Sequence, residues 1–302
     1  FILLGSLLNL STSSYPSQPE SFRKKEKLTI LHFTDAYELD ERKDEPVASV
    51  ARFKTALDTY RDPNTLVLFS GDIFSPSPLS SFAKGENMIE PLNAFGIDAA
   101  CLGNHDFDFG VERCLNLVSK CNFPWMMSNL IEASTQKLLA NTSEYIVLDR
   151  AGYRIGLMGL ADIECIKLAD LPPGKFDTLS FVDTAKRLAK FLREEEKCDI
   201  VIALTHMIFP SDRELAENVP ELDLILGGHD HKRIVEKIKG TYAIHSGSDF
   251  KEITKIVLEP ISSGTTQEEI YKGQWKIDIQ HIEVTRAFEP NEYLKNVTIR
   301  WN

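Results

Sequence analysis

Short apolar runs alternate with amphipathic stretches along the chain from residue 28 onward. Continuous apolar runs of this length are typical of strands that are covered on both faces. The alternation predicts an α/β fold built from βαβ layers. The runs are residues 28–33 (LTILHF), 65–70 (TLVLFS), 98–103 (DAACLG), 124–130 (PWMMSNL), 153–160 (YRIGLMGL), 198–205 (CDIVIALT) and 222–228 (LDLILGG).

Apolar residues between these runs recur at the three- and four-residue spacing of a helix face. The spacing predicts helices at 50–60, 88–95, 111–118 and 182–192, with faces that belong to the core. After residue 231 the pattern changes to alternating strands at 234–247, 252–260 and 274–286, the first with a Lys-Gly turn, and a polar loop at 261–273. We expect these antiparallel strands to join the first sheet or a second one.

Polar side chains follow five of the expected strands at the point where each strand ends. In open α/β sheets this edge is where ligands bind. A lone aspartate there is usually a turn former or a helix cap, and a lone buried histidine is usually a core residue, but five such coincidences indicate a common site. The residues are Asp35, Asp72, Asn104 with His105, His206, and His229 with His231.

Glycines precede three of these groups, in the pairs Gly71–Asp72, Gly103–Asn104 and Gly228–His229. Glycine at a strand end allows a sharp turn and a close approach of two backbones. Carboxylate, amide and imidazole ligands suit Zn, Mn, Fe, Ni or Mg, and there are too many of them for one tetrahedral ion. They suit two divalent ions about 3.5–4 Å apart, an arrangement that cleaves phosphate esters with a water whose pKa the ions lower.

The order of these groups resembles the calcineurin-like metallophosphoesterase superfamily: Asp35, then GD (71–72), GNHDFD (103–108), TH (205–206) and GHDH (228–231). The stretches LTILHFTD and GNHDFDFG resemble its 5′-nucleotidase branch, which includes bacterial UDP-sugar hydrolases. The resemblance covers roughly residues 28–260. It implies a layered α/β/β/α fold with mixed central sheets and the site at the carboxyl ends of strands.

The resemblance also implies a role for each residue. His105 would face the phosphate and, paired with Asp108, stabilise or protonate the leaving oxygen, because a carboxylate fixes the imidazole tautomer and raises its pKa. The implied metal ligands are Asp72 as the bridge between both ions, Asp35 and His231 for the first ion, and Asn104, His206 and His229 for the second.

The chain departs from the family pattern at Tyr37, where the family has the histidine of Asp-x-His. A phenol has an unperturbed pKa near 10 and binds well only to a strongly acidic cation such as ferric iron. Either Tyr37 ligates the first ion or water fills the gap. His245, in HSGSDF (245–250), matches a family loop near the site and is either a metal or substrate contact or only a strand residue.

These residues favour two-metal hydrolysis of a phosphomonoester of a small metabolite, such as a nucleoside 5′-monophosphate or a sugar phosphate, by in-line attack of metal-bound hydroxide. One alternative is a phosphodiester or nucleotide-sugar pyrophosphate hydrolase, which the same metals would serve. Another is a phosphate-binding pseudoenzyme whose first metal site decayed at Tyr37. The presence of His105 and Asp108 argues against it, because a binding module needs no general acid.

The 302 residues include 34 basic and 45 acidic side chains, a formal net charge of −11. This balance disfavours a nucleic-acid polymer as partner, and a phosphate would need a local positive charge such as bound metal. The five cysteines show no zinc-ligand spacing and are interpreted as core thiols of a reducing compartment such as the cytoplasm. The oligomeric state is left open.

Three segments follow from these patterns. Residues 1–27 form an N-terminal segment that we interpret as a signal remnant and linker, so secretion is an alternative to the cytoplasm. The apolar run of this segment is too short to span a bilayer. Residues 28–288 form the catalytic domain. Residues 289–302 are expected to begin a linker to a further C-terminal domain, so we expect the chain to be a fragment.

Overall fold

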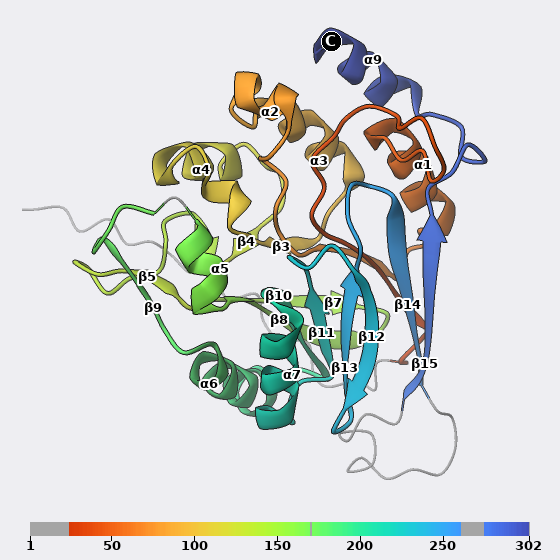
Figure 1. Cartoon of the computed structure of the whole chain (residues 1–302). Coiled ribbons are helices and arrows are strands. Elements are labelled where there is room, and N and C mark those ends of the chain that lie inside the picture. The colour runs from red at the N-terminus through yellow and green to blue at the C-terminus, as the bar shows by residue number, and fades with distance from the viewer. Residues whose placement is uncertain (1–23, 170, 261–274, 302) are drawn as a thin grey trace, which may run out of the picture.

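The computed structural model describes residues 24–169, 171–260 and 275–301. Most of the expected N-terminal segment and the polar loop at 261–273 lie outside the described residues. Two large β-sheets pack face to face and carry helices on their outer faces (Figure 1). This arrangement confirms the predicted layered α/β/β/α fold.

The first sheet has the strand order β15-β14-β1-β2-β3-β4-β6. Strands β1, β2, β3, β4 and β6 run parallel, while β14 and β15 are antiparallel additions at one edge. The strands are β1 (Leu28–Phe33), β2 (Thr65–Phe69), β3 (Ala99–Cys101), β4 (Trp125–Met126), β6 (Thr142–Ser143), β14 (Glu252–Pro260) and β15 (Trp275–Glu283).

The second sheet has the order β12-β13-β11-β10-β8-β7, with antiparallel strands at both edges of a parallel centre. A separate ribbon pairs β5 (Leu130–Glu132) with β9 (Phe176–Thr178). The strands of the second sheet are β7 (Tyr145–Arg150), β8 (Tyr153–Ala161), β10 (Ile200–His206), β11 (Leu224–Gly227), β12 (Arg233–Ile238) and β13 (Thr241–Ser246).

Helices α1, α3, α4 and α9 pack on the first sheet, and α6 and α7 pack on the second. Short helices α2 and α5 and the 3₁₀ helices η1 and η2 lie in the connections. The helices are α1 (Val50–Tyr60), α2 (Pro78–Ala83), η1 (Glu86–Met88), α3 (Ile89–Phe95), η2 (His105–Phe107), α4 (Val111–Val118), α5 (Ile163–Leu168), α6 (Phe181–Glu194), α7 (Phe209–Asn218) and α9 (Glu292–Trp301).

Strand β1 shows why the strands read as continuous apolar runs. Leu28 and Ile30 belong to the core between the two sheets, whereas Leu31 and Phe33 belong to the core under the helices. Because successive side chains point to opposite faces, a strand buried on both faces must be apolar at nearly every position. His32 is the ionisable side chain of this strand, and it is fully buried.

Most sequence predictions match these elements, and the exceptions have local causes. The run at 124–130 divides into β4 and β5, which belong to different sheets. Between them Asn129 donates to and accepts from the backbone of Ala161, and Ser128 bonds to Gly159, so the chain leaves the first sheet there. The late strands join both sheets: β12 and β13 join the second, and β14 and β15 the first.

The C-terminal helix α9 packs on the domain itself. Its Leu294 and Val297 are buried in the core under the helices, and the backbone N–H of Asn291 donates to the carbonyl of Ala51 at 3.0 Å. That residues 289–302 lead to a further domain stays a prediction. Within the described ranges, every helix is too short or too polar to cross a membrane.

Candidate metal centre

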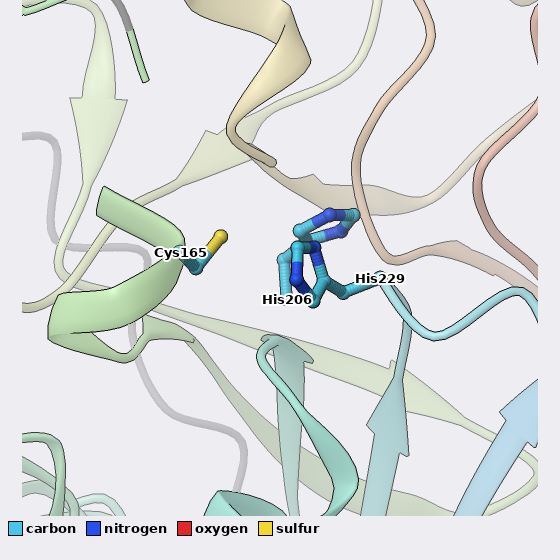
Figure 2. Close-up of side chains that lie close together, drawn as sticks. All are labelled: Cys165, His206 and His229. Carbon is cyan, nitrogen blue, oxygen red and sulfur yellow. The ribbon is translucent and has the colours of Figure 1, made fainter. Parts of the chain in front are cut away.

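The ends of strands from both sheets meet at one place and bring the predicted polar residues together. The ligand atoms of Asp35, Asp72 and His206 all lie within 4.8 Å of one another. A second group, formed by Cys165, His206 and His229, meets the same limit (Figure 2). His206 belongs to both groups, so the two form one continuous cluster.

Asp35, which follows β1, is fully buried. Its Oδ2 accepts hydrogen bonds from the Thr34 hydroxyl at 2.6 Å and from the backbone N–H of His229 at 2.9 Å. Its Oδ1 lies 3.3 Å from Nε2 of His231. A buried carboxylate costs free energy unless it is paired, and these contacts supply partners from two strand ends.

Asp72, which follows β2, lies at the centre of the cluster. Its Oδ1 accepts the backbone N–H of His105 at 2.8 Å, and its Oδ2 lies 3.0 Å from Nε2 of His206. Its backbone has a positive φ of 63°. Positive φ is uncommon outside glycine and is concentrated at functional sites, and Asp35, His229 and His231 share it here.

His206, the last residue of β10, is fully buried. Its Nδ1 donates to the backbone carbonyl of Ser70 at 2.7 Å, which turns Nε2 toward the two carboxylates. Nε2 has no aligned hydrogen-bond partner among the described residues. Burial lowers the pKa of His206, but the charges of Asp72 and Asp35 outweigh it and raise this pKa to about 10. The cluster therefore holds an excess of negative charge that favours a cation.

Asn104, which follows β3, contacts two residues of the second ligand group, Cys165 and His229. Its Oδ1 lies 3.0 Å from Nδ1 of His229 and accepts a hydrogen bond from the thiol of Cys165 at 3.3 Å. Sequence reasoning grouped Cys165 with the core thiols and missed this position. The signal that could have found it is that Cys165 follows β8, a sixth strand that ends at the same edge. Burial, followed by the charge of Asp72, raises the pKa of this thiol.

Tyr37 points into the cluster. Its hydroxyl donates to Oδ1 of Asp35 at 3.2 Å and lies 2.9 Å from Nε2 of His231. Burial, followed by the charges of Asp72 and Asp35, raises the pKa of Tyr37 far above its usual range. The phenol thus occupies the space between Asp35 and His231.

His105 stands beside the cluster, in η2, with a half-buried side chain. Its Nδ1 lies 2.9 Å from Oδ2 of Asp108, and this hydrogen bond is the main cause that raises the pKa of His105. Asp108 engages Nδ1, which leaves Nε2 as the second ring nitrogen of His105. This is the pairing that the motif predicted.

Asp106 is a residue that sequence reasoning missed. It is buried and accepts the backbone N–H groups of Asp72 at 3.0 Å, Ile73 at 2.9 Å and Gly103 at 2.9 Å, which fixes the loops after β2 and β3 to each other. A Cβ at Gly71 would lie 2.6 Å from the backbone nitrogen of Gly103, so the close approach of these loops requires glycine. The position of Asp106 between the two predicted site residues His105 and Asp108 was the only sequence signal.

His245 lies in β13 and turns toward α7. Its Nε2 contacts Oδ2 of Asp212 at 2.6 Å, and both side chains are buried. Neither group of metal-ligating atoms found among the described residues includes His245. The cluster itself fits divalent cations, because it combines two buried carboxylates with a buried imidazole nitrogen that makes no aligned hydrogen bond in the described part of the chain.

Comparisons with known proteins identify the family of this chain. The family model of the calcineurin-like phosphoesterases matches residues 28–233. The 5′-nucleotidase of Vibrio cholerae serotype O1 is 30% identical over 253 residues, which cover 77% of this chain and 45% of that protein. Protein UshA of Yersinia enterocolitica is 31% identical over 223 residues, which cover 67% of this chain and 40% of that protein.

The chain therefore spans less than half the length of these curated relatives. The crystal structure of a 5′-nucleotidase precursor from Thermus thermophilus superimposes with a TM-score of 0.79 at 19% identity, covering 91% of this chain and 58% of that one. This likeness supports the fold. Calcineurin-like phosphoesterases are typically dinuclear metal-dependent hydrolases. The extent of the family match confirms what the motifs predicted, and the chain belongs to the calcineurin-like phosphoesterase family.

Proposed function

We propose that this domain hydrolyses a phosphomonoester of a small metabolite with the help of two divalent ions. Nucleoside 5′-monophosphates are the first candidate substrates, because the relatives and the superimposed structure include proteins named 5′-nucleotidase. The observation that carries the proposal is the position of Asp72. One of its oxygens faces the buried nitrogen of His206, and the other accepts the N–H of His105.

The proposed first ion is held by Asp35, Asp72 and His231, with Tyr37 beside them. The proposed second ion is held by Asp72, Asn104, His206 and His229. This division follows the resemblance to the family. The two groups of ligand atoms share His206, whose Nε2 lies 3.0 Å from Oδ2 of Asp72, so the ligands of both proposed ions belong to one cluster. When bound, the ions would neutralise charge on the phosphoryl oxygens and lower the pKa of a water molecule.

The residues of the chain supply orientation and a proton. Asp106 fixes the loops that carry Asp72 and Asn104, so the ligands are held in place by a backbone anchor. Asp108 binds Nδ1 of His105 and leaves Nε2 to protonate the leaving oxygen of the substrate. A phosphate-binding module without catalysis would need neither the proton donor nor the carboxylate that orients it, so this pair favours an enzyme.

A substrate panel tests the proposal. The chain is stripped of metal and assayed with Mn²⁺, Zn²⁺, Mg²⁺ and Ni²⁺ added back one at a time. The substrates are AMP, glucose 6-phosphate and p-nitrophenyl phosphate as monoesters, bis(p-nitrophenyl) phosphate as a diester, and UDP-glucose as a pyrophosphate. We expect metal-dependent release of phosphate from the monoesters.

The matched control is Asp72→Asn, which should lack this activity with every ion. Faster cleavage of the diester or of UDP-glucose than of every monoester would assign the site to those bonds instead. Binding of metal and phosphate without turnover of any substrate would favour a pseudoenzyme and contradict the proposal.

A further inference from the structure

The thiol of Cys165 lies where the proposed second ion would be held. Cys165 is in α5, and its Sγ lies 3.3 Å from Oδ1 of Asn104. Its Sγ and the ligand atoms of His206 and His229 all lie within 4.8 Å of one another (Figure 2). Sulfur, nitrogen and oxygen ligands about 2.0–2.3 Å from one ion lie roughly 2.8–3.8 Å from one another when the angle between them is about 90–110°. The observed Sγ–Oδ1 distance falls in this range.

Cys165 differs from the other cysteines, all of which lie in the described part of the chain. Cys114, Cys101 and Cys198 each belong to one of the three hydrophobic cores, and Cys121 packs against the first. Cys165 belongs to none of these cores, although it is buried. Apolar packing therefore explains the other four thiols and leaves this one facing polar ligands.

The position of Cys165 is fixed by the local structure. Asp162 caps α5 by accepting the backbone N–H of Cys165 at 2.7 Å, and its other oxygen accepts the hydroxyl of Ser211 at 2.8 Å. Residue Ala161, just before the cap, is held by both ends of the Asn129 amide. The turn that presents the thiol is thus held in place by several hydrogen bonds.

A second observation points to a ligand at the same place. Nε2 of His206 is buried and makes no aligned hydrogen bond among the described residues, although Oδ2 of Asp72 lies 3.0 Å away. Because an unpaired buried polar atom costs free energy, native structures rarely leave one without a partner. A cation in the cluster would satisfy this nitrogen and would draw in the neighbouring sulfur.

We propose that Cys165 is a further protein ligand of the second ion and binds it as a thiolate. The inference rests on the proposed two-ion site. Binding replaces the S–H bond with a metal–sulfur bond and releases the proton to solvent. A thiolate in place of another oxygen makes the site softer, so it should select Zn²⁺, Co²⁺ and Cd²⁺ over Mg²⁺ and Mn²⁺. Zinc is then the physiological ion that this site fits best.

Titration of the metal-free chain with Co²⁺ tests the inference, because a thiolate bound to Co²⁺ gives a near-ultraviolet charge-transfer band that nitrogen and oxygen ligands do not. We expect this band in the unmodified chain. It should be absent in Cys165→Ser and Cys165→Ala and present in Cys198→Ala, a matched variant of a buried thiol in the third hydrophobic core. We also expect both changes at Cys165 to lower Cd²⁺ affinity by about 10–100-fold or more, with a much smaller loss for Mg²⁺.

Cadmium NMR on the unmodified chain gives the same answer without any variant. A signal in the range of mixed sulfur, nitrogen and oxygen ligands supports the inference even if both variants fail to fold. Two bound ions with neither the Co²⁺ band nor a sulfur-shifted cadmium signal would show that Cys165 only donates to Asn104, and the inference would fail while the proposed function stands. Absence of any bound ion would overturn both.

Discussion

Two histidines of this domain are equally buried and have opposite surroundings. His32 and His206 are both 0% exposed, and each sits on a strand with a parallel neighbour. Burial lowers the pKa of His32 to about 3, with a further contribution from His245. Burial also acts to lower the pKa of His206, but Asp72 and Asp35 raise it to about 10. Neighbouring charge, and not depth, therefore decides the state of each ring.

The two rings also differ in how their nitrogens are hydrogen-bonded. The Ser70 hydroxyl donates to the carbonyl of Leu226 at 2.6 Å, so it accepts from Nε2 of His32 at 2.8 Å, and Nδ1 pairs with Ser246 at 2.5 Å. Both nitrogens of His32 are thus satisfied within the protein. His206 bonds to the backbone through Nδ1, whereas its Nε2 lies 3.0 Å from Oδ2 of Asp72 without an aligned hydrogen bond among the described residues.

The largest expected effect is that of Asp72→Asn. Removing the charge that faces His206 should weaken both proposed ions together and abolish activity. It should also make His206 more like His32, because the carboxylate that raises its pKa is gone. Elemental analysis and phosphate release measure the loss of metal and of activity. A variant with two ions per chain and normal turnover would remove Asp72 from the role of bridge.

His105→Asn should lower kcat by about 10²–10⁴, the usual scale for a general acid, with metal content unchanged. Asp108→Asn should act in the same direction but more mildly, since it removes only the partner at 2.9 Å. The loss should shrink for aryl phosphates, whose leaving groups need little protonation. Loss of metal from the His105 variant would instead identify this imidazole as a metal ligand, the role proposed for His206.

Changes at Tyr37 should alter the first ion by about 10–100-fold in affinity, the scale on which supporting groups tune metal binding. Tyr37→His should tighten binding, because it adds a nitrogen donor beside Asp35. Tyr37→Phe decides the role of the hydroxyl: weaker binding means that it ligates, and unchanged binding means that it only donates to Asp35. Calorimetric metal titration compares the three proteins. Equal affinities in all of them would mean that the side chain at position 37 does not contribute to metal binding.

The smallest expected effect on activity is that of His32→Gln. It should leave turnover unchanged and lower the free energy of unfolding by about 1–3 kcal/mol, the cost of an unsatisfied buried group. The folded pKa of about 3 lies below the ordinary 6.5, so the unfolded chain takes up a proton that the folded chain resists. Stability from neutral His32 is therefore full above pH 6.5 and is lost as the pH falls toward 3.

Denaturant unfolding between pH 7 and about pH 4, which lies inside the window that the two pKa values set, measures this contribution. The His32→Gln variant should lose less stability over that range than the unmodified chain. An unchanged pH slope would mean that His32 is not the group that resists protonation.

The fold and the meeting of polar side chains at one place could be predicted from the sequence, because both depend on patterns that run along the chain. Strands buried on both faces must be apolar, and polar residues at their ends must meet at one edge, so Asp35, Asp72 and His206 could be placed in advance. The part played by Asp106 could not be placed, since it acts through backbone N–H groups. The position of Cys165 after β8 was a signal, but the direction of its thiol depends on the turn that Asp162 caps. The division of residues 124–130 between β4 and β5 depends likewise on the contacts of Asn129 with a distant strand.

The role of His206 in holding metal is tested most directly by the metal content of His206→Gln and His32→Gln, measured side by side after equilibration with Zn²⁺ and gel filtration. The two variants make the same change at equal burial, one beside the carboxylates and one among neutral hydroxyls. We expect His32→Gln to keep the stoichiometry of the unmodified chain and His206→Gln to lose the second ion. Equal metal content in the two folded variants would contradict this expectation.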